Sequence, residues 1–271
     1  AVHSPRLAVR LDHDSQHIRH AHRERRVCHE RAAPGRSGCA RRSLFVLAID
    51  RRSETIAPDL RVADLGRLGA VLQRKVVELF EPIRAKSLGL GRGNHEKKYE
   101  QSKDHSDMHD LLCDELGLPN LGYCGLFDVV FVRKPGVKVP RLIDRETAAK
   151  IHDKTTQTSF RIFTHHGAGY SQTPGGKLNR LLRFMQSFEA DIYFCGHVHD
   201  RVVKDQPTIR ANSTCTKIED SVRIGIIAGS YLRTYTQDHC GYGEIKGYAP
   251  VPLGSVAVKI RPDSREVKAE I

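Results

Sequence analysis

Short apolar segments that alternate with amphipathic ones constrain the fold of this chain more than any other feature of its sequence. Seven segments have the composition of β-strands: residues 44–49, 127–132, 159–164, 191–195, 222–228, 255–260 and 266–271. Residues 62–86 and 177–188 carry apolar side chains at the three-to-four-residue spacing of amphipathic helices, the first with a break expected near Pro82. Residues 146–154 are predicted to form a short helix. Strands that alternate with helices favour an α/β fold with a mixed sheet or two sheets.

The patterning divides the chain into a poorly patterned start and one domain. Residues 1–43 hold six of the 15 histidines among scattered arginines and show little sustained period of strand or helix. We therefore predict a basic N-terminal segment over residues 1–43 and a single domain over residues 44–271. The segment could be a partly disordered arm, a degraded or wrongly translated start to the domain, or a functional segment of unusual composition.

The charge balance points to anionic partners. Lysine and arginine number 44 against 32 aspartate and glutamate residues, which gives a net charge of +12 and favours nucleic acid, phosphorylated substrates or an acidic surface. Nowhere do about 18 apolar residues run together, so we expect no transmembrane helix and no membrane partner. The seven cysteines form no CxxC pair and are odd in number, which favours a reducing, cytoplasmic location over a disulfide framework.

Three polar clusters each follow an apolar segment, at the point where a loop is expected. They are Asn94-His95, His165-His166 and His197-Val198-His199. Ligands gather at the carboxyl ends of strands in α/β folds, so these loops can converge on one pocket. Imidazole nitrogen and amide oxygen together suit divalent metals such as Zn, Mn, Fe or Ni. An extended backbone would place the rings of His197 and His199 on the same side, whereas a turn would spread them.

In order and spacing, these clusters resemble the motifs of the calcineurin-like metallophosphoesterase family. The resemblance is carried by Gly93-Asn94-His95-Glu96, Thr164-His165-His166-Gly167 and Gly196-His197-Val198-His199, and it covers roughly residues 44–260. Residues 164–200 are similar to phage-borne and bacterial members. The resemblance implies a four-layer αββα sandwich of two mixed β-sheets flanked by helices. It also implies a dinuclear site for two divalent metal ions (Mn, Fe, Zn, Ni or Mg). The implied activity is the cleavage of phosphomonoesters or phosphodiesters by a metal-activated hydroxide.

The resemblance also implies a role for each matching residue. Asn94, His197 and either His165 or His166 would bind one metal ion, and His165 is the preferred member of that pair. His199 would bind the other metal ion. His95 would bind no metal and would sit over the leaving group, where an imidazole can protonate or hydrogen-bond the departing oxygen.

The sequence departs from the family pattern upstream, where Asp-x-His and Gly-Asp-x-x-Asp do not appear cleanly. Neutral ligands alone would leave about +4 of charge in one pocket, so a two-metal site needs a bridging carboxylate. Asp50, which ends the strand predicted over residues 44–49, is the best candidate, although it could simply cap that strand. For Asp-x-His the candidates are Asp12, Asp14 and His17, which a basic N-terminal arm explains equally well.

Two other functions stay open. One is a catalytically impaired relative that binds metal or nucleic acid without hydrolysis, motivated by the missing upstream motifs and the charge of +12. The other is a nuclease, because a basic surface collects nucleic acid. Two metal ions per chain would support the enzyme, and one or none would support the impaired relative. The predicted partners are therefore a phosphate-ester substrate and, as an alternative, nucleic acid.

Overall fold

A computed structural model describes residues 6–11, 68–97, 108–133, 141–143, 157–169, 171–212, 214–235 and 241–271. The strand predicted over residues 44–49 and the helix predicted over residues 146–154 lie outside these ranges. Among the described helices, none is long and apolar enough to cross a membrane. The break expected near Pro82 is confirmed, because helix α1 (Leu68–Phe80) gives way to a 3-10 helix, η2 (Glu81–Lys86), with this proline in its first turn.

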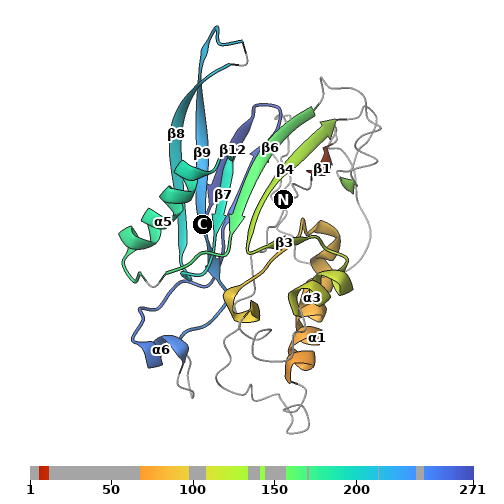
Figure 1. Ribbon diagram of the computed structural model, residues 1–271, viewed down its shortest axis with the longest axis vertical. Helices are drawn as coiled ribbons and strands as arrows, with labels where there is room; N and C mark the ends of the chain where they lie inside the picture. Colours follow the sequence, from red (N-terminus) through yellow and green to blue (C-terminus); the bar gives the residue numbers. More distant parts are fainter. Residues whose placement is uncertain are drawn as a thin grey trace, which may run out of the picture.

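Eight of the described strands form one mixed sheet (Figure 1). They are β1 (Arg6–Leu11), β4 (Cys124–Arg133), β5 (Arg141–Ile143), β6 (Gln157–His165), β7 (Ile192–Cys195), β8 (Arg201–Ala211), β9 (Ile218–Ser230) and β10 (Gly254–Ser255). The order is β10-β9-β7-β6-β4-β1-β5, and β8 pairs with β9 as a long antiparallel hairpin. β6, β7 and β9 run parallel, so their carboxyl ends reach the same edge of the sheet.

β1 comes from the part of the sequence that was expected to precede the domain. Its residues Arg6–Leu11 run parallel to residues 128–133 of β4 and antiparallel to β5. These six residues are therefore part of the main sheet, which departs from the expected division of the chain at residue 44. Leu7, Val9 and Leu11 alternate with Ala8 and Arg10, the period of a half-buried strand, but the run is short and lies beside a histidine-rich stretch.

Helix α5 (Pro174–Ser187) covers one face of the sheet (Figure 1). Its Leu181 and Met185 pack in one buried cluster with Phe163, Tyr193 and Ile227 of the sheet. The helix approaches β9 so closely that a Cβ atom added at Gly225 would lie 2.5 Å from the Sδ atom of Met185. Glycine at this position therefore lets the helix and the sheet pack without a clash.

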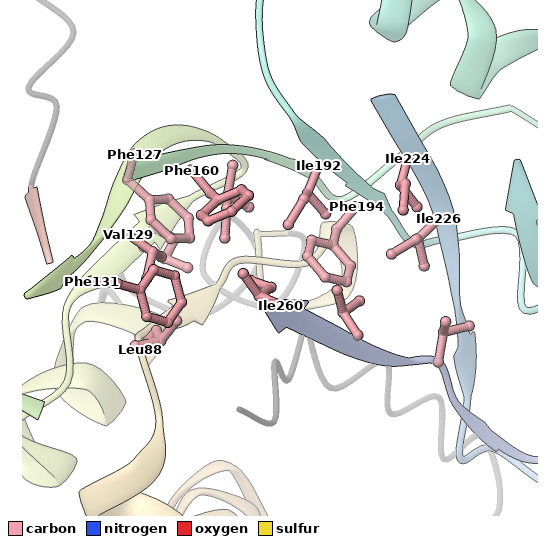
Figure 2. Close-up of a cluster of buried hydrophobic side chains, with 14 residues drawn as sticks. Leu88, Phe127, Val129, Phe131, Phe160, Ile192, Phe194, Ile224, Ile226 and Ile260 are labelled. Carbon is pink, nitrogen blue, oxygen red and sulfur yellow. The ribbon is translucent and has the colours of Figure 1, made fainter. Parts of the chain in front are cut away.

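The opposite face of the sheet is covered by a second layer of strands. β11 (Ala257–Arg261) and β12 (Glu266–Glu270) form an antiparallel hairpin, and β2 (Leu90–Gly91) pairs with β3 (Asn120–Gly122). The larger hydrophobic cluster fills the space between the layers, and Figure 2 shows Phe127, Phe160 and Phe194 of the sheet beside Ile260 of the hairpin. Leu88, which precedes β2, and Leu121 of β3 join the same cluster.

The fourth layer consists of α1 and α3 (Met108–Leu116), which lie together in Figure 1. Val76 and Phe80 of α1 pack with Leu112 and Leu116 of α3 against Leu90 of β2. The layers therefore follow in the order helix, sheet, strands, helices. This arrangement confirms the predicted α/β class and is consistent with the predicted αββα sandwich. A further short helix, α6 (Tyr242–Lys246), lies between β9 and β10 in the chain.

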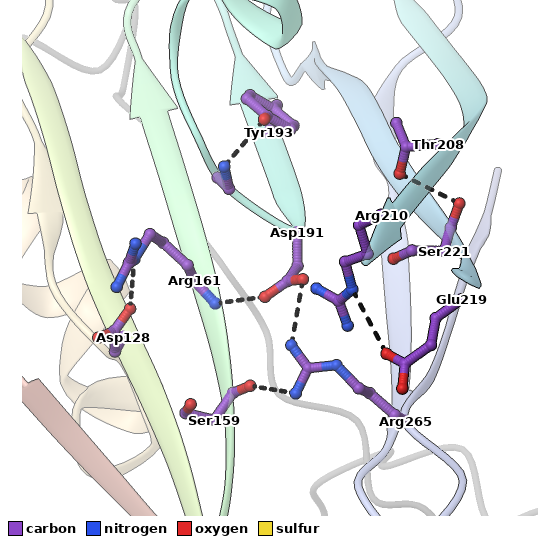
Figure 3. Close-up of polar contacts among 11 residues, drawn as sticks. Asp128, Ser159, Arg161, Asp191, Tyr193, Thr208, Arg210, Glu219, Ser221 and Arg265 are labelled. Atoms are coloured by element: carbon purple, nitrogen blue, oxygen red, sulfur yellow. Dashed lines mark hydrogen bonds and ion pairs between the residues drawn. The ribbon is translucent and has the colours of Figure 1, made fainter. Parts of the chain in front are cut away.

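Polar contacts fasten the β11–β12 hairpin to the amino ends of β6 and β7 (Figure 3). The Asp191 carboxylate accepts a hydrogen bond from the backbone N–H of Arg161 at 2.8 Å and lies 3.4 Å from a guanidinium nitrogen of Arg265. Arg265 also donates to the carbonyl of Ser159 at 3.1 Å, and its guanidinium lies 5.2 Å above the centre of the Phe160 ring. These contacts lie at the amino ends of the parallel strands, opposite the carboxyl edge of the sheet.

Candidate functional site

The loops that follow β6 and β7 meet at the carboxyl edge of the sheet. The backbone N–H of Gly196 donates to the carbonyl of His165 at 3.2 Å. A Cβ atom at Gly167 would lie 2.5 Å from the carbonyl oxygen of Gly196 and 2.9 Å from the Cβ atom of His197, and the φ angle of Gly167 is 98°. Both the space and the backbone angle therefore require glycine, which lets the two histidine-bearing loops touch.

A third loop reaches the same place from the second layer of strands. Arg92, directly after β2, donates its backbone N–H to the carbonyl of Gly122 at 2.9 Å, and His166 donates its backbone N–H to the carbonyl of Tyr123 at 2.9 Å. The segment after β3 therefore links the loop after β2 to the loop after β6. Gly93 passes beside the His166 ring, since a Cβ atom there would lie 3.4 Å from its Cε1 atom. A helical turn over residues 94–97 then begins at Asn94.

Three side chains, one from each loop, converge at this point. The Oδ1 atom of Asn94 lies 2.9 Å from the Nε2 atom of His166, and the Nδ1 atom of His197 lies 3.2 Å from the same nitrogen. The rings of His166 and His197 meet edge to face, with their centres 5.2 Å apart. His166 is only 5% exposed, so the centre of this group is fixed by packing. We call Asn94, His166 and His197 the central cluster.

The donor atoms of the central cluster fit a first-row divalent cation. Two ligand atoms bound to one ion at about 2.1 Å lie about 3.0–3.4 Å apart for octahedral and tetrahedral angles. The observed separations of 2.9 and 3.2 Å are close to that range. An amide oxygen only accepts hydrogen bonds, so the contact between Asn94 and His166 is a hydrogen bond when the Nε2 atom of His166 carries the proton. A metal ion can take the place of that proton, and nitrogen with oxygen suits Zn, Mn, Fe or Ni.

His165, the preferred ligand from the sequence, has different surroundings from its neighbour. Its Nδ1 atom accepts a hydrogen bond from the backbone N–H of Gly167 at 2.7 Å. Its ring stacks on Phe184 with centres 4.5 Å apart and meets Tyr123 edge to face at 5.5 Å. Burial, with a smaller effect of Arg180, lowers the pKa of His165 and favours the neutral imidazole. Of the two histidines, the structure brings His166 to Asn94 and His197.

The His197-Val198-His199 segment forms a turn rather than an extended strand end. His197 and His199 have φ angles of 71° and 48°, in the left-handed region that few residues other than glycine adopt. Strained backbone of this kind is commonly found at functional sites. His199 is partly exposed and lies two residues beyond the central cluster on the same turn.

The carboxylates predicted for this site lie outside the described residues. Asp50, Asp12, Asp14 and His17 all fall between residues 12 and 67, a range that the structure does not describe. Within the described ranges, no three side chains of histidine, cysteine, aspartate or glutamate gather closely enough to hold a metal ion. The central cluster has two histidines and an asparagine, so all of its ligands are neutral.

Glu96 holds the loop of Asn94 in place, a role that the sequence did not indicate. Its carboxylate accepts a hydrogen bond from the backbone N–H of Gly93, and its other oxygen lies 3.3 Å from the Nδ1 atom of His109. His109 lies on α3, is 1% exposed, and has its Nε2 atom 3.5 Å from the Sγ atom of Cys113. Burial lowers the pKa of His109, but its hydrogen bonds to Cys113 and Glu96 raise it to about 10. The only sequence signal is the one-turn spacing of His109 and Cys113 on a helix.

A buried ion pair holds the histidine turn from its other side. The Nζ atom of Lys177, in the first turns of α5, lies 3.0 Å from a carboxylate oxygen of Asp200. The other oxygen of Asp200 accepts a hydrogen bond from the backbone N–H of Arg201 at 2.9 Å. Lys177 is 8% exposed, so the ammonium is largely withdrawn from water and paired. The turn that carries His197 and His199 is therefore fixed between β7 and β8.

Comparison with known protein families gives one match. The model of the calcineurin-like phosphoesterase family matches residues 52–201, which is more than half of the chain. The matched range contains all three members of the central cluster, together with His95, His165 and His199. No curated protein matches this chain.

Proposed function

Because the chain belongs to the calcineurin-like phosphoesterase family, we propose that it is a metal-dependent phosphohydrolase with Asn94, His166 and His197 among its metal ligands. The observation that carries this proposal is the convergence of an amide oxygen and two imidazole nitrogens from three separate loops. Members of the family hydrolyse phosphoesters, and the substrate proposed here is a phosphomonoester or a phosphodiester.

The proposal includes a second metal ion beside the first. His199 is its proposed ligand, because it lies two residues beyond His197 in the same loop. A bridging carboxylate is needed, since the central cluster contributes no negative charge to offset two divalent cations. Asp50 is the proposed bridge, on the argument from its position after a predicted strand. Mn, Fe, Zn, Ni and Mg are the candidate metals.

Metal ions held there would act as Lewis acids on the phosphoryl group and on the attacking water. The residues of the chain supply the rest of the chemistry. His95 directly follows Asn94 on the helical turn and is partly exposed, so it is the proposed proton donor to the departing oxygen. The contacts of Glu96 with Gly93 and His109 hold the loop that carries Asn94 and His95, and thereby orient both side chains.

The test is hydrolysis by protein that has been stripped with a chelator and reloaded with one metal at a time. An aryl phosphate and an aryl phosphodiester are offered with Mn²⁺, Ni²⁺ or Zn²⁺, and the bound metal is counted by mass spectrometry. Turnover that depends on added metal, with two ions per chain, is the expected result. Metal binding without turnover of either ester would contradict the proposal.

That contradicting result defines the second candidate function, a metal-binding relative without hydrolytic activity. It is favoured by one observation, that the described part of the site contributes only neutral ligands. Neutral ligands can hold one ion, but two ions without a bridge repel each other. The number of bound ions therefore separates the candidates: two ions support the enzyme, and one ion without turnover supports the binding protein.

A further inference from the structure

An open pocket of about 460 Å³ lies beside the central cluster. Its walls include Arg92, Lys97, Asp110, Asn120, Leu121 and Tyr123. Two of these residues touch or adjoin the cluster. Arg92 precedes Gly93 and Asn94 in the same loop, and the Tyr123 ring lies with its centre 5.1 Å from that of His166. The volume is in the range of small-molecule sites, about 300–1,000 Å³.

The polar groups of this pocket are arranged around a positive charge. The guanidinium of Arg92 lies 3.3 Å from the carboxylate of Asp110, which also accepts a hydrogen bond from the side-chain amide of Asn120. Asp110 therefore fixes the guanidinium and offsets its charge. Lys97 adds a second cation at the end of the helical turn, so among the described residues that line the pocket one positive charge remains in excess. An excess of positive charge, beside hydrogen-bond donors from guanidinium, ammonium and amide groups, favours an anionic ligand.

The pocket also has a wall for an organic group. The Tyr123 hydroxyl donates a hydrogen bond to the carbonyl of Gly167 at 3.2 Å, which fixes the ring between the pocket and the loop after β6. The ring lines the pocket and at the same time contacts the His166 ring of the central cluster. Its flat face suits a planar or apolar connector between two polar ends.

We propose that this pocket binds a second anionic group, a phosphate or a carboxylate, carried by the organic part of the substrate. The protein then prefers phosphoesters whose organic part bears a further negative charge. This inference rests on the proposed function, because the first anionic group is the phosphate held at the central cluster. Lys97 is the residue that sets the preference, since Asp110 already offsets the charge of Arg92.

The kinetic test uses two substrates that differ only in charge, 4-carboxyphenyl phosphate and 4-carbamoylphenyl phosphate. A third, 1,4-phenylene bisphosphate, replaces the carboxylate by a second phosphate. The ratio of kcat/KM for each charged substrate over the neutral one is measured for the metal-loaded wild type and for Lys97→Gln. We expect the ratio to fall about 1.5- to 5-fold in the variant, the range of one exposed charge pair. Lys86→Gln, an exposed lysine on η2 outside the pocket, is the matched control and should keep the wild-type ratios.

A binding test separates failure of this inference from failure of the proposed function. The non-hydrolysable probes (4-carboxyphenyl)phosphonate and (4-carbamoylphenyl)phosphonate are titrated into the metal-loaded protein by calorimetry. A carboxylate preference that Lys97→Gln reduces and Lys86→Gln keeps supports the pocket, even if no ester is turned over. Equal affinities of the two probes in the wild type, together with charged-to-neutral kinetic ratios that Lys97→Gln leaves unchanged, would overturn it. A reduced ratio for the bisphosphate alone would assign the pocket to phosphate rather than carboxylate.

Discussion

The side-chain oxygen of Asn94 lies 2.9 Å from the Nε2 atom of His166, although 72 residues separate the two in the sequence. The contact joins the second layer of strands to the main sheet, and His197 completes it from a third loop. Contacts between loops on different layers depend on every packing surface between them. The geometry of this contact therefore depends on how the loops at the carboxyl edge of the main sheet pack against the second layer of strands.

The close approach of the two histidine loops should depend on Gly167. In Gly167→Ala, the added Cβ atom would clash with the carbonyl of Gly196 and the Cβ atom of His197, at a φ angle that alanine avoids. We expect a loss of about 1–3 kcal/mol in the free energy of unfolding. We also expect weaker metal binding, because the loops of His166 and His197 must separate. Gly175→Ala is the control, since nothing lies within 4 Å of its added Cβ atom. Calorimetric metal titration and denaturant unfolding of both variants test this, and equal metal affinities would contradict it.

His95 should affect turnover without affecting metal content. His95→Ala removes the proposed proton donor while keeping Asn94 and the two histidines of the central cluster. Turnover should fall by about 10²–10⁴-fold, the range for general acid–base catalysis. The bound metal, counted by mass spectrometry, should stay at the wild-type level. A variant that loses metal together with activity would show that His95 is a ligand and not a proton donor.

His109 should make stability depend on pH. Its folded-state pKa of about 10 lies above the usual pKa of 6.5 for a free histidine side chain. The imidazolium therefore stabilises the fold fully below about pH 6.5, and this contribution disappears as the pH rises through about 10. At pH 6 we expect His109→Gln to be less stable than the wild type by about 1–3 kcal/mol, the range for a hydrogen bond to a charged group. The difference in free energy of unfolding, measured from pH 6 to 10, should shrink as the pH rises. A difference that is constant over that range would refute a charged His109.

Asp50 should bridge the two proposed metal ions. Asp50→Asn removes one negative charge while keeping the shape of the side chain, so at least one ion should be lost at micromolar metal. Activity should fall far more than stability. Calorimetric titration of the wild type and the variant gives the stoichiometry directly. Unchanged stoichiometry and affinity would remove Asp50 from the site and favour the metal-binding protein without hydrolysis.

The fold class could be predicted from the sequence, because the spacing of the apolar residues and the lengths of the apolar segments indicate which segments form strands and which form helices. The strands β4, β6, β7 and β9 and the helices α1 and α5 coincide with segments whose spacing indicated them. β1 was not predicted, because six residues with two arginines give a weak signal beside a histidine-rich stretch. The strand is defined by its neighbours β4 and β5, and such partners, far along the chain, cannot be deduced from local spacing.

The candidate site could be predicted to the level of its loops but not of its side chains. His165 and His166 are adjacent, and successive residues at a strand end point to opposite faces. His165 shares the parity of Phe163, whose side chain packs in the cluster under α5, so it faces the helix. The sequence shows that His165 and Phe163 share one face of the strand. It does not show which face α5 covers. The contact of Glu96 with His109 likewise needs the packing of α3 against β2, which no spacing in the sequence indicates.

We predict that His166, and not its neighbour His165, binds metal together with Asn94 and His197. The most direct measurement is the metal affinity and stoichiometry of His166→Ala and His165→Gln, by calorimetry on chelator-stripped protein with Mn²⁺ or Zn²⁺. We predict that His166→Ala loses at least one ion or binds it at least about 100-fold more weakly, as expected for removal of a metal ligand. His165→Gln should keep the wild-type stoichiometry and lose only stability, because His165 packs against Phe184 and accepts a hydrogen bond from Gly167. Loss of metal in His165→Gln with full binding in His166→Ala would contradict the account.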